Sequence, residues 1–283
     1  MTWWGKVYFG AVLLQSVVFV AVSVAVLVDP GPSKAAKIYP VLGLLCVAAF
    51  LYFSLDAVRS ENRFQFMASM LAGLLITLFV LVSAFSKPDE EELGPVWHRA
   101  HVVVVIFSLL FQVLYLGLCK PTLESFGFMA FKVAGADLVL QDLYSVYLAF
   151  LSLLKLDLFV SLLLLLMSKF FLLDVDSPGV YLGSITLVLS FLLAGITWFA
   201  VTRESKPWVL AFAVLAVYKP AYLAYNLVTY EIKRDLLPEG VTYTQFAVVG
   251  TLSFVVRAAL CWYTYRMYRG FGKGLRARVF EGT

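Results

Sequence analysis

Charged residues are scarce in this sequence of 283 residues: Asp, Glu, Lys and Arg together make up only 14%. Hydrophobic residues make up 62%, and the mean hydropathy is +0.90. Soluble domains average about 45–50% apolar and about 25% charged residues, so the composition excludes a soluble protein and predicts one that crosses a membrane repeatedly. The net charge of +4 comes from cations spread along loops and apolar segments. Without a basic patch, nucleic acid is not expected as a partner.

Cysteine is also sparse, with Cys46, Cys119 and Cys261 in or beside apolar segments and no CxxC pair. This pattern predicts neither a disulfide framework nor a zinc site. The sequence has no Asn-X-Ser/Thr acceptor, no His-Glu-x-x-His, no Gly-x-Ser-x-Gly, no paired intramembrane aspartates and no phosphate loop. No catalytic residue and no cofactor is therefore predicted, and we expect a non-enzymatic protein.

Histidine is limited to His98 and His101, which lie close to the acidic run 89–92. Histidines and carboxylates at helical spacing can bind a metal, but a third ligand in a fixed geometry is required. The acidic residues fall in a loop, so ordinary interfacial histidines are the favoured interpretation and no metal site is predicted.

Long apolar runs fill most of the chain. A membrane-spanning helix needs about 20 residues, and the runs predict about eight spans in an all-α polytopic protein with a single membrane domain, 1–283. The expected spans are approximately 7–28, 38–55, 66–84, 102–118, 141–173, 181–201, 208–230 and 246–268. Residues 121–136 are mixed in character and suit a short segment lying in the interface. The run 141–173 would be ~45 Å or more as one helix, so it must tilt, kink or project beyond a ~30 Å hydrocarbon core.

The distribution of Lys and Arg predicts the orientation. Eight spans place both termini on one side, together with Arg203, Lys206 and the basic tail 269–283, whereas the acidic run 89–92 falls on the other side. Cytosolic loops carry an excess of Lys and Arg, so both termini are expected in the cytosol. The basic tail can there meet anionic lipid headgroups, which makes membrane lipids the expected partners.

Four ionisable residues fall well inside predicted spans: Lys155, Asp157, Lys219 and Arg257. Such residues are costly in hydrocarbon and indicate a functional site or a buried pair, so we expect Asp157 within reach of Lys219 or Arg257. Lys155 and Asp157 are about 200° apart around a helix and cannot simply pair with each other. The favoured interpretation is a structural tie between the fifth, seventh and eighth spans, with Lys155 reaching the headgroups. The alternative is a site for an anionic ligand, such as a lipid phosphate or a carboxylate.

The seventh span also contains Tyr218, Tyr222, Tyr225 and Asn226 around Pro220. The tyrosines lie on one helix face, and their hydroxyls could line a polar cleft beside the carbonyl that Pro220 leaves free. Hydrogen-bonded packing between helices is the more common use of such a stripe.

Two short blocks resemble an uncharacterised fungal-type family of multi-pass Golgi or endomembrane proteins. They are Phe131-Lys132-Val133-Ala134-Gly135-Ala136-Asp137, continuing through Tyr144, Tyr147, Phe150-Leu151 and Leu154-Lys155-Leu156-Asp157-Leu158-Phe159, and the tail Phe271-Gly272-Lys273-Gly274-Leu275. The resemblance implies a Golgi or other endomembrane location and supplies no activity and no catalytic residues.

Two functions are therefore weighed. The first is a non-enzymatic membrane protein that acts through lipids or protein partners, a second copy included. The second is a transporter or channel for an anionic small molecule or lipid, with Lys219 and Arg257 as contacts and Asp157 as a coupling group. An enclosed cavity with these charges facing into it would favour the second.

Overall fold

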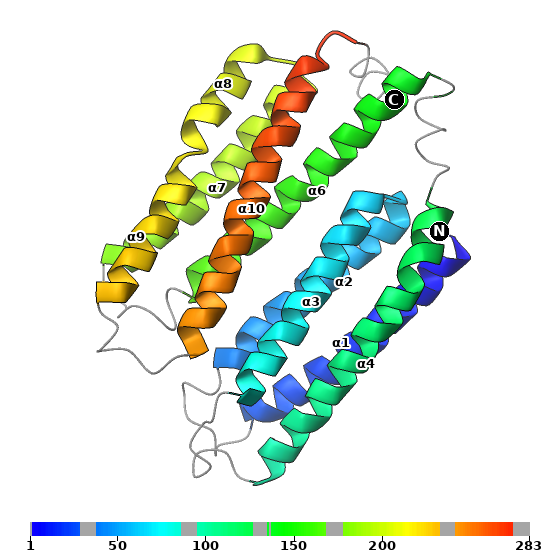
Figure 1. Cartoon of the computed structure of the whole chain (residues 1–283), viewed down its shortest axis with the longest axis vertical. Helices are drawn as coiled ribbons and strands as arrows, with labels where there is room; N and C mark the ends of the chain where they lie inside the picture. The colour runs from blue at the N-terminus through cyan, green and yellow to red at the C-terminus, as the bar shows by residue number, and fades with distance from the viewer. Residues whose placement is uncertain are drawn as a thin grey trace. The chain divides into compact units, whose positions relative to one another are not determined.

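A computed structural model describes residues 2–28, 38–85, 95–126, 135, 137–167, 178–232 and 241–273. In these residues the chain is helical and forms no strand (Figure 1). The helices are α1 (Trp3–Val28), α2 (Ile38–Ser60), α3 (Arg63–Phe85), α4 (Pro95–Ser125), α6 (Leu138–Met167), α7 (Pro178–Thr202), α8 (Lys206–Leu215), α9 (Tyr218–Ile232) and α10 (Val241–Arg269). Seven helical stretches of the described chain are long and apolar enough to cross a membrane, and a shorter apolar stretch lies in α3, at Arg63–Leu78. The predicted all-α membrane class is thus supported.

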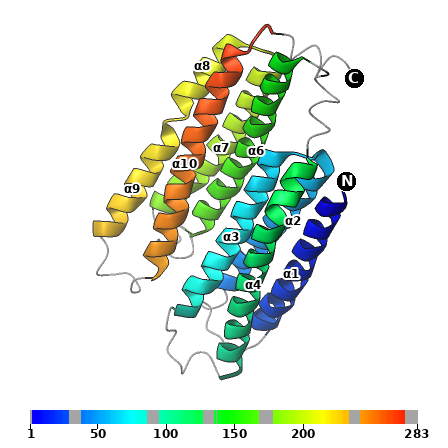
Figure 2. The same cartoon turned by 45° about the vertical axis from the view of Figure 1, so that its right-hand side comes forward.

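The helices group into two compact units, Met1–Met129 with α1 to α4 and Ala130–Thr283 with α6 to α10. Within each unit the helices lie side by side (Figures 1 and 2). Many of their outward side chains are large and apolar, as lipid contact requires. The prediction of a single membrane domain stays a prediction.

Aromatic rings and hydroxyls hold the first unit together. The Tyr8 ring of α1 lies 4.7 Å from the ring of Phe66 and 5.5 Å from that of Tyr115, centroid to centroid. Its hydroxyl is 2.8 Å from Ser69 Oγ, and the Tyr115 hydroxyl donates to Gln15 Oε1 at 2.6 Å. Lipid chains are as apolar as leucine, so packing and interhelical hydrogen bonds of this kind stabilise membrane helices.

The end of α4 corrects an expectation. Residues 121–125 were predicted to begin an interfacial segment, but they continue α4, which passes through Pro121 to Ser125. Phe126 just beyond is buried, with its ring 5.9 Å from that of Phe66, and its carbonyl accepts a hydrogen bond from Arg63 Nε at 2.7 Å. These contacts fix the extended helix against α3. The rest of the expected segment, 127–134 and 136, lies outside the described residues.

In the second unit α6 packs against α7 and α10 (Figure 1). It begins at Leu138, three residues before the expected start, because Asp137 caps it: Oδ1 accepts from the backbone N–H groups of Val139 at 2.9 Å and Leu140 at 3.2 Å. The helix then continues for 30 residues to Met167. At ~1.5 Å per residue it is ~45 Å long, which exceeds the ~30 Å hydrocarbon core as expected. Residues 168–173 lie outside the described part.

The seventh predicted span is broken in the middle. α8 ends at Leu215 and α9 begins at Tyr218, and the two helices lie end to end beside α7 (Figure 1). Pro220 has no N–H to donate to the Ala216 carbonyl, and its ring crowds that same carbonyl, which favours an interruption of the helix at this point. The break places Lys219 in the first turn of α9.

Candidate intramembrane charge site

Asp157 lies in the interior of the second unit and is 3% exposed. Its Oδ1 is 2.7 Å from Lys219 Nζ, and its Oδ2 is 2.9 Å from Arg257 Nη2. One carboxylate of α6 therefore contacts one cation from α9 and another from α10. The sequence led us to expect that Asp157 contacts one of these cations, and in the structure it contacts both.

The Lys219 ammonium has an acceptor for each of its donors. Nζ donates to Asp157 Oδ1 at 2.7 Å, to Ser161 Oγ at 2.8 Å and to the Asp157 carbonyl at 3.4 Å. Ser161 Oγ itself donates to the Asp157 carbonyl at 2.6 Å. An ammonium has three donors, so this set satisfies it completely. Lys219 is only 1% exposed.

Arg257 is held less completely. Its Nη2 forms the ion pair with Asp157, but the direction of approach does not make a hydrogen bond, and Nε has no hydrogen-bond partner within the described ranges. The guanidinium carbon lies 5.7 Å from the centroid of the Tyr218 ring, within the range of a cation–π contact. Coulombic attraction and the aromatic ring therefore position this side chain.

Hydroxyl groups connect the charges to α7. Ser190 Oγ donates to Ser161 Oγ at 3.3 Å and lies 2.6 Å from the Tyr218 hydroxyl, which also donates to the Thr186 carbonyl at 3.2 Å. Ser161, Thr186 and Ser190 had not been predicted as site residues. Ser161 could have been found, because it is four residues after Asp157 on the same helix face. Thr186 and Ser190 gave no such signal, since they reach the site only through the packing of α7.

The other expected site residues have different positions. Lys155 is half-buried on α6, two residues before the Asp157 that pairs with Lys219 and Arg257. The tyrosine stripe is divided: Tyr218 joins the network, Tyr222 is buried, and Tyr225 is exposed. The side chain of Asn226 lies outside the described residues, as do those of His98 and His101. In the described part of the chain, no group of three or more His, Cys, Asp or Glu side chains could hold a metal ion.

The site contains two cations and one carboxylate, a formal charge of +1 when all three are ionised. In a low-dielectric interior the excess cation has two possible uses. It can help to hold three helices around one carboxylate, or it can attract an anion.

Comparison with protein families finds one match: residues 134–266 match a domain of unknown function (DUF7789). This stretch contains every residue of the charge site, from Asp157 to Arg257. The chain is thus similar to a family without an assigned function, and the match says nothing about fungal origin or the Golgi. Comparison with curated proteins and with solved structures gives no match.

Proposed function

We propose that this protein is a non-enzymatic multi-pass membrane protein that acts through lipids or protein partners, in a Golgi or other endomembrane. The proposal includes eight spans, cytosolic termini, and a charge site that ties helices together. The observation that carries it is the closure of that site. Both Asp157 oxygens and all three Lys219 donors are engaged within the protein, so two of the three charged groups that would hold a substrate are already occupied by protein partners.

Burial supports the same conclusion. A transport site must open to one side of the membrane, whereas the side chains of Asp157, Lys219 and Arg257 are each at most 4% exposed. Buried pairs of this kind fix which helices pack together, and removing one partner leaves an uncompensated charge. The tie joins α6, α9 and α10, and the hydroxyl network adds α7.

A second candidate is a transporter or channel for a small anion. It is favoured by Arg257 Nε, which has no hydrogen-bond partner among the described residues, and by the break between α8 and α9, which ends two residues before Lys219. Transporters often use interrupted helices whose N-terminal ends, with their partial positive charge, point at anionic substrate groups. An anion bound here would balance the formal charge of +1.

Anion-dependent stability separates the two candidates. The purified full-length protein is heated with inorganic phosphate, acetate, succinate or no added anion, at constant ionic strength. The tie predicts the same unfolding temperature in all four. A binding site predicts that one anion stabilises the protein, by about 2.7 kcal/mol at 100 times its Kd, and that Arg257→Met abolishes this effect.

The matched control is Arg266→Met, because Arg266 pairs with Asp142 at 3.2 Å on the exposed surface of the same helices, α10 and α6. It should behave as the wild type with every anion. An anion that stabilises the wild type and Arg266→Met, but not Arg257→Met, and that also crosses proteoliposomes containing the protein, would overturn the tie and establish the transporter.

Location and partners need separate measurements. A fluorescently tagged chain should co-localise with Golgi or other endomembrane markers, and the resemblance stated above is what supports this part of the proposal. The mass of the purified protein–detergent complex shows whether a second copy is the partner. Accumulation only at the plasma membrane would contradict the endomembrane location and leave the structural role of the charge site unaffected.

A further inference from the structure

We propose that the groove between α8 and α10 binds an anionic phospholipid, with the phosphate at Lys206 and an acyl chain along the apolar wall. This inference specifies the lipid partner of the proposed function and rests on it. The site is separate from the Asp157 cluster and uses none of its charged residues.

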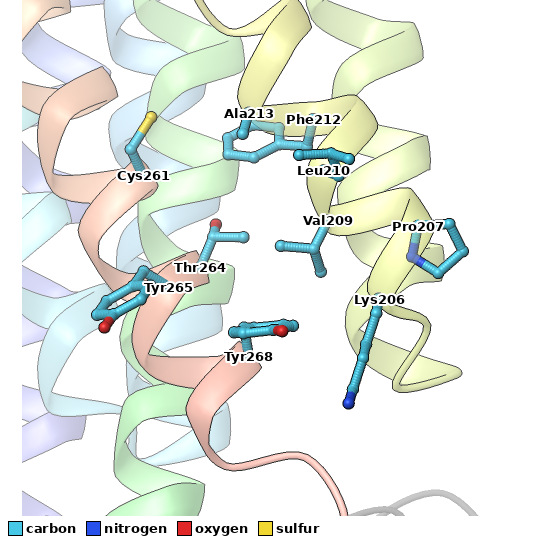
Figure 3. Close-up of a pocket in the computed structure, with 10 residues that line it drawn as sticks. All are labelled: Lys206, Pro207, Val209, Leu210, Phe212, Ala213, Cys261, Thr264, Tyr265 and Tyr268. Atoms are coloured by element: carbon cyan, nitrogen blue, oxygen red, sulfur yellow. The ribbon is translucent and has the colours of Figure 1, made fainter.

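The groove is a pocket of about 620 Å³ between two antiparallel helices (Figure 3). Lys206 and Tyr268 lie at one end of it, and Ala213 and Cys261 at the other. The floor includes the buried Phe212, and most of the lining is apolar. Ligand pockets typically enclose about 300–1,000 Å³ and combine apolar walls with a few polar groups, as this one does.

The position of the groove suits a lipid. From Lys206 to Ala213 the helix rises ~10 Å, about a third of the ~30 Å hydrocarbon core, so the pocket runs from one helix end into a single leaflet. The mouth is open along its length, since Leu210 is 67% exposed and Tyr265 49% exposed. A lipid can therefore enter sideways from the bilayer, and its chain can pack against Leu210 and Phe212.

The charge at the mouth selects an anion. At this end of the unit, Glu204 accepts a hydrogen bond from the Gly272 N–H at 2.8 Å, and Asp142 pairs with Arg266 at 3.2 Å. In the part of the chain that the structure describes, no carboxylate forms an ion pair with Lys206. Its ammonium is exposed and ready to bind a phosphate.

Neighbouring residues strengthen the preference. Arg269 and Lys273 are exposed cations just beyond Tyr268, and tyrosines at a membrane interface place their hydroxyls at headgroup level. Basic pockets between membrane helices on the cytosolic side are a recurring way to bind anionic headgroups. The proposed orientation puts this end of α8 and α10 on that side.

Binding is measured with the purified full-length protein in detergent and a chain-labelled fluorescent phosphatidylserine. Unlabelled phosphatidylserine, phosphatidylcholine and inorganic phosphate compete against it. We expect phosphatidylserine to compete best and free phosphate not to compete at millimolar concentration, because the acyl wall contributes to binding. Equal competition by phosphatidylcholine would refute the anion preference, and competition by free phosphate alone would refute the acyl wall.

Two exposed positions test the parts of the site. Lys206→Gln should weaken phosphatidylserine binding about fivefold, the effect of one cation near a membrane surface, and leave phosphatidylcholine binding unchanged. Ala213→Phe fills the inner end of the groove and should weaken both lipids. The matched control is Lys120→Gln, an exposed lysine of α4 that should bind as the wild type.

Wild-type affinity in both Lys206→Gln and Ala213→Phe would overturn the site. This outcome is distinguishable from failure of the proposed function. Anion-dependent stabilisation that disappears in Arg257→Met would overturn the tie, and it would not change the phosphatidylserine binding of Lys206→Gln. Conversely, wild-type phosphatidylserine binding by Lys206→Gln would leave the account of the Asp157 cluster unchanged.

Discussion

Replacing Asp157 by leucine should destabilise the protein far more than removing either of its cations. The cluster carries a formal charge of +1, so Asp157→Leu leaves two buried cations and a charge of +2. Lys219→Met instead leaves Asp157 paired with Arg257 and a charge of zero. Asp157→Leu therefore raises the net charge buried in the cluster, whereas Lys219→Met removes it.

The distances give the size of the effect. At 2.7 Å and 2.9 Å, each ion pair amounts to about 6 kcal/mol of coulombic attraction with an effective dielectric constant of 20. Desolvation of the charges offsets most of this, and breaking a buried pair typically costs about 3–5 kcal/mol. We therefore expect Asp157→Leu to lose at least that much, and Lys219→Met to change stability by no more than about 1–2 kcal/mol, since it leaves a balanced pair.

The assay is thermal unfolding of the purified protein, followed by the loss of monodisperse protein after heating. Asp157→Leu should lower the midpoint by about 6–20 °C, from about 2–4 °C per kcal/mol for a chain of this size. The control is Asp142→Leu on the same helix, whose partner Arg266 is exposed, so that its loss costs under about 1 kcal/mol.

Combining Asp157→Leu with Lys219→Met and Arg257→Met should restore most of the lost stability, because apolar residues of similar volume often replace a buried pair without cost. Combining Asp157→Leu with only one of these two methionine substitutions should not restore the stability, because one buried cation would remain without a partner. Equal midpoints for Asp157→Leu and Asp142→Leu would refute the reasoning, as would a Lys219→Met protein less stable than Asp157→Leu.

Gly270→Leu should destabilise the second unit by about 1–3 kcal/mol in the same unfolding assay, because a Cβ at Gly270 meets the Leu143 side chain. The control is Gly195→Leu, on an open face of α7. Equal destabilisation by the two substitutions would contradict the close packing of Gly270 against Leu143. Tyr8→Phe removes the buried hydroxyl that lies 2.8 Å from a serine of α3 and should cost about 1 kcal/mol; an unchanged midpoint would show that this contact contributes nothing. An Asn-Ser-Thr acceptor placed within 86–94 should be glycosylated in microsomes, where no native acceptor competes; an unmodified product would contradict cytosolic termini.

Local sequence patterns predicted some elements well. Apolar run length placed helices over the expected spans, and the cap at Asp137 is a local interaction between a side chain and backbone N–H groups two and three residues ahead. The extension of α4 to Ser125 was missed, because what fixes it is the contact of Phe126 with α3. Pro220 indicated a disturbance in the seventh span, while the split into two helices became visible only in the structure.

The sequence alone predicted helices long and apolar enough to cross a membrane, as the structure has in its described residues, and identified the charges that fall in those apolar segments. Both follow from composition and from run lengths of about 20 residues. Only the tertiary structure decided the partners. Lys219 is 62 residues from Asp157, and nothing in local spacing distinguishes a single pair from a carboxylate shared by two cations. That choice depends on how α6, α9 and α10 pack, because side chains distant in sequence meet only when helix faces do. The same packing of α8 against α10 created the groove at Lys206.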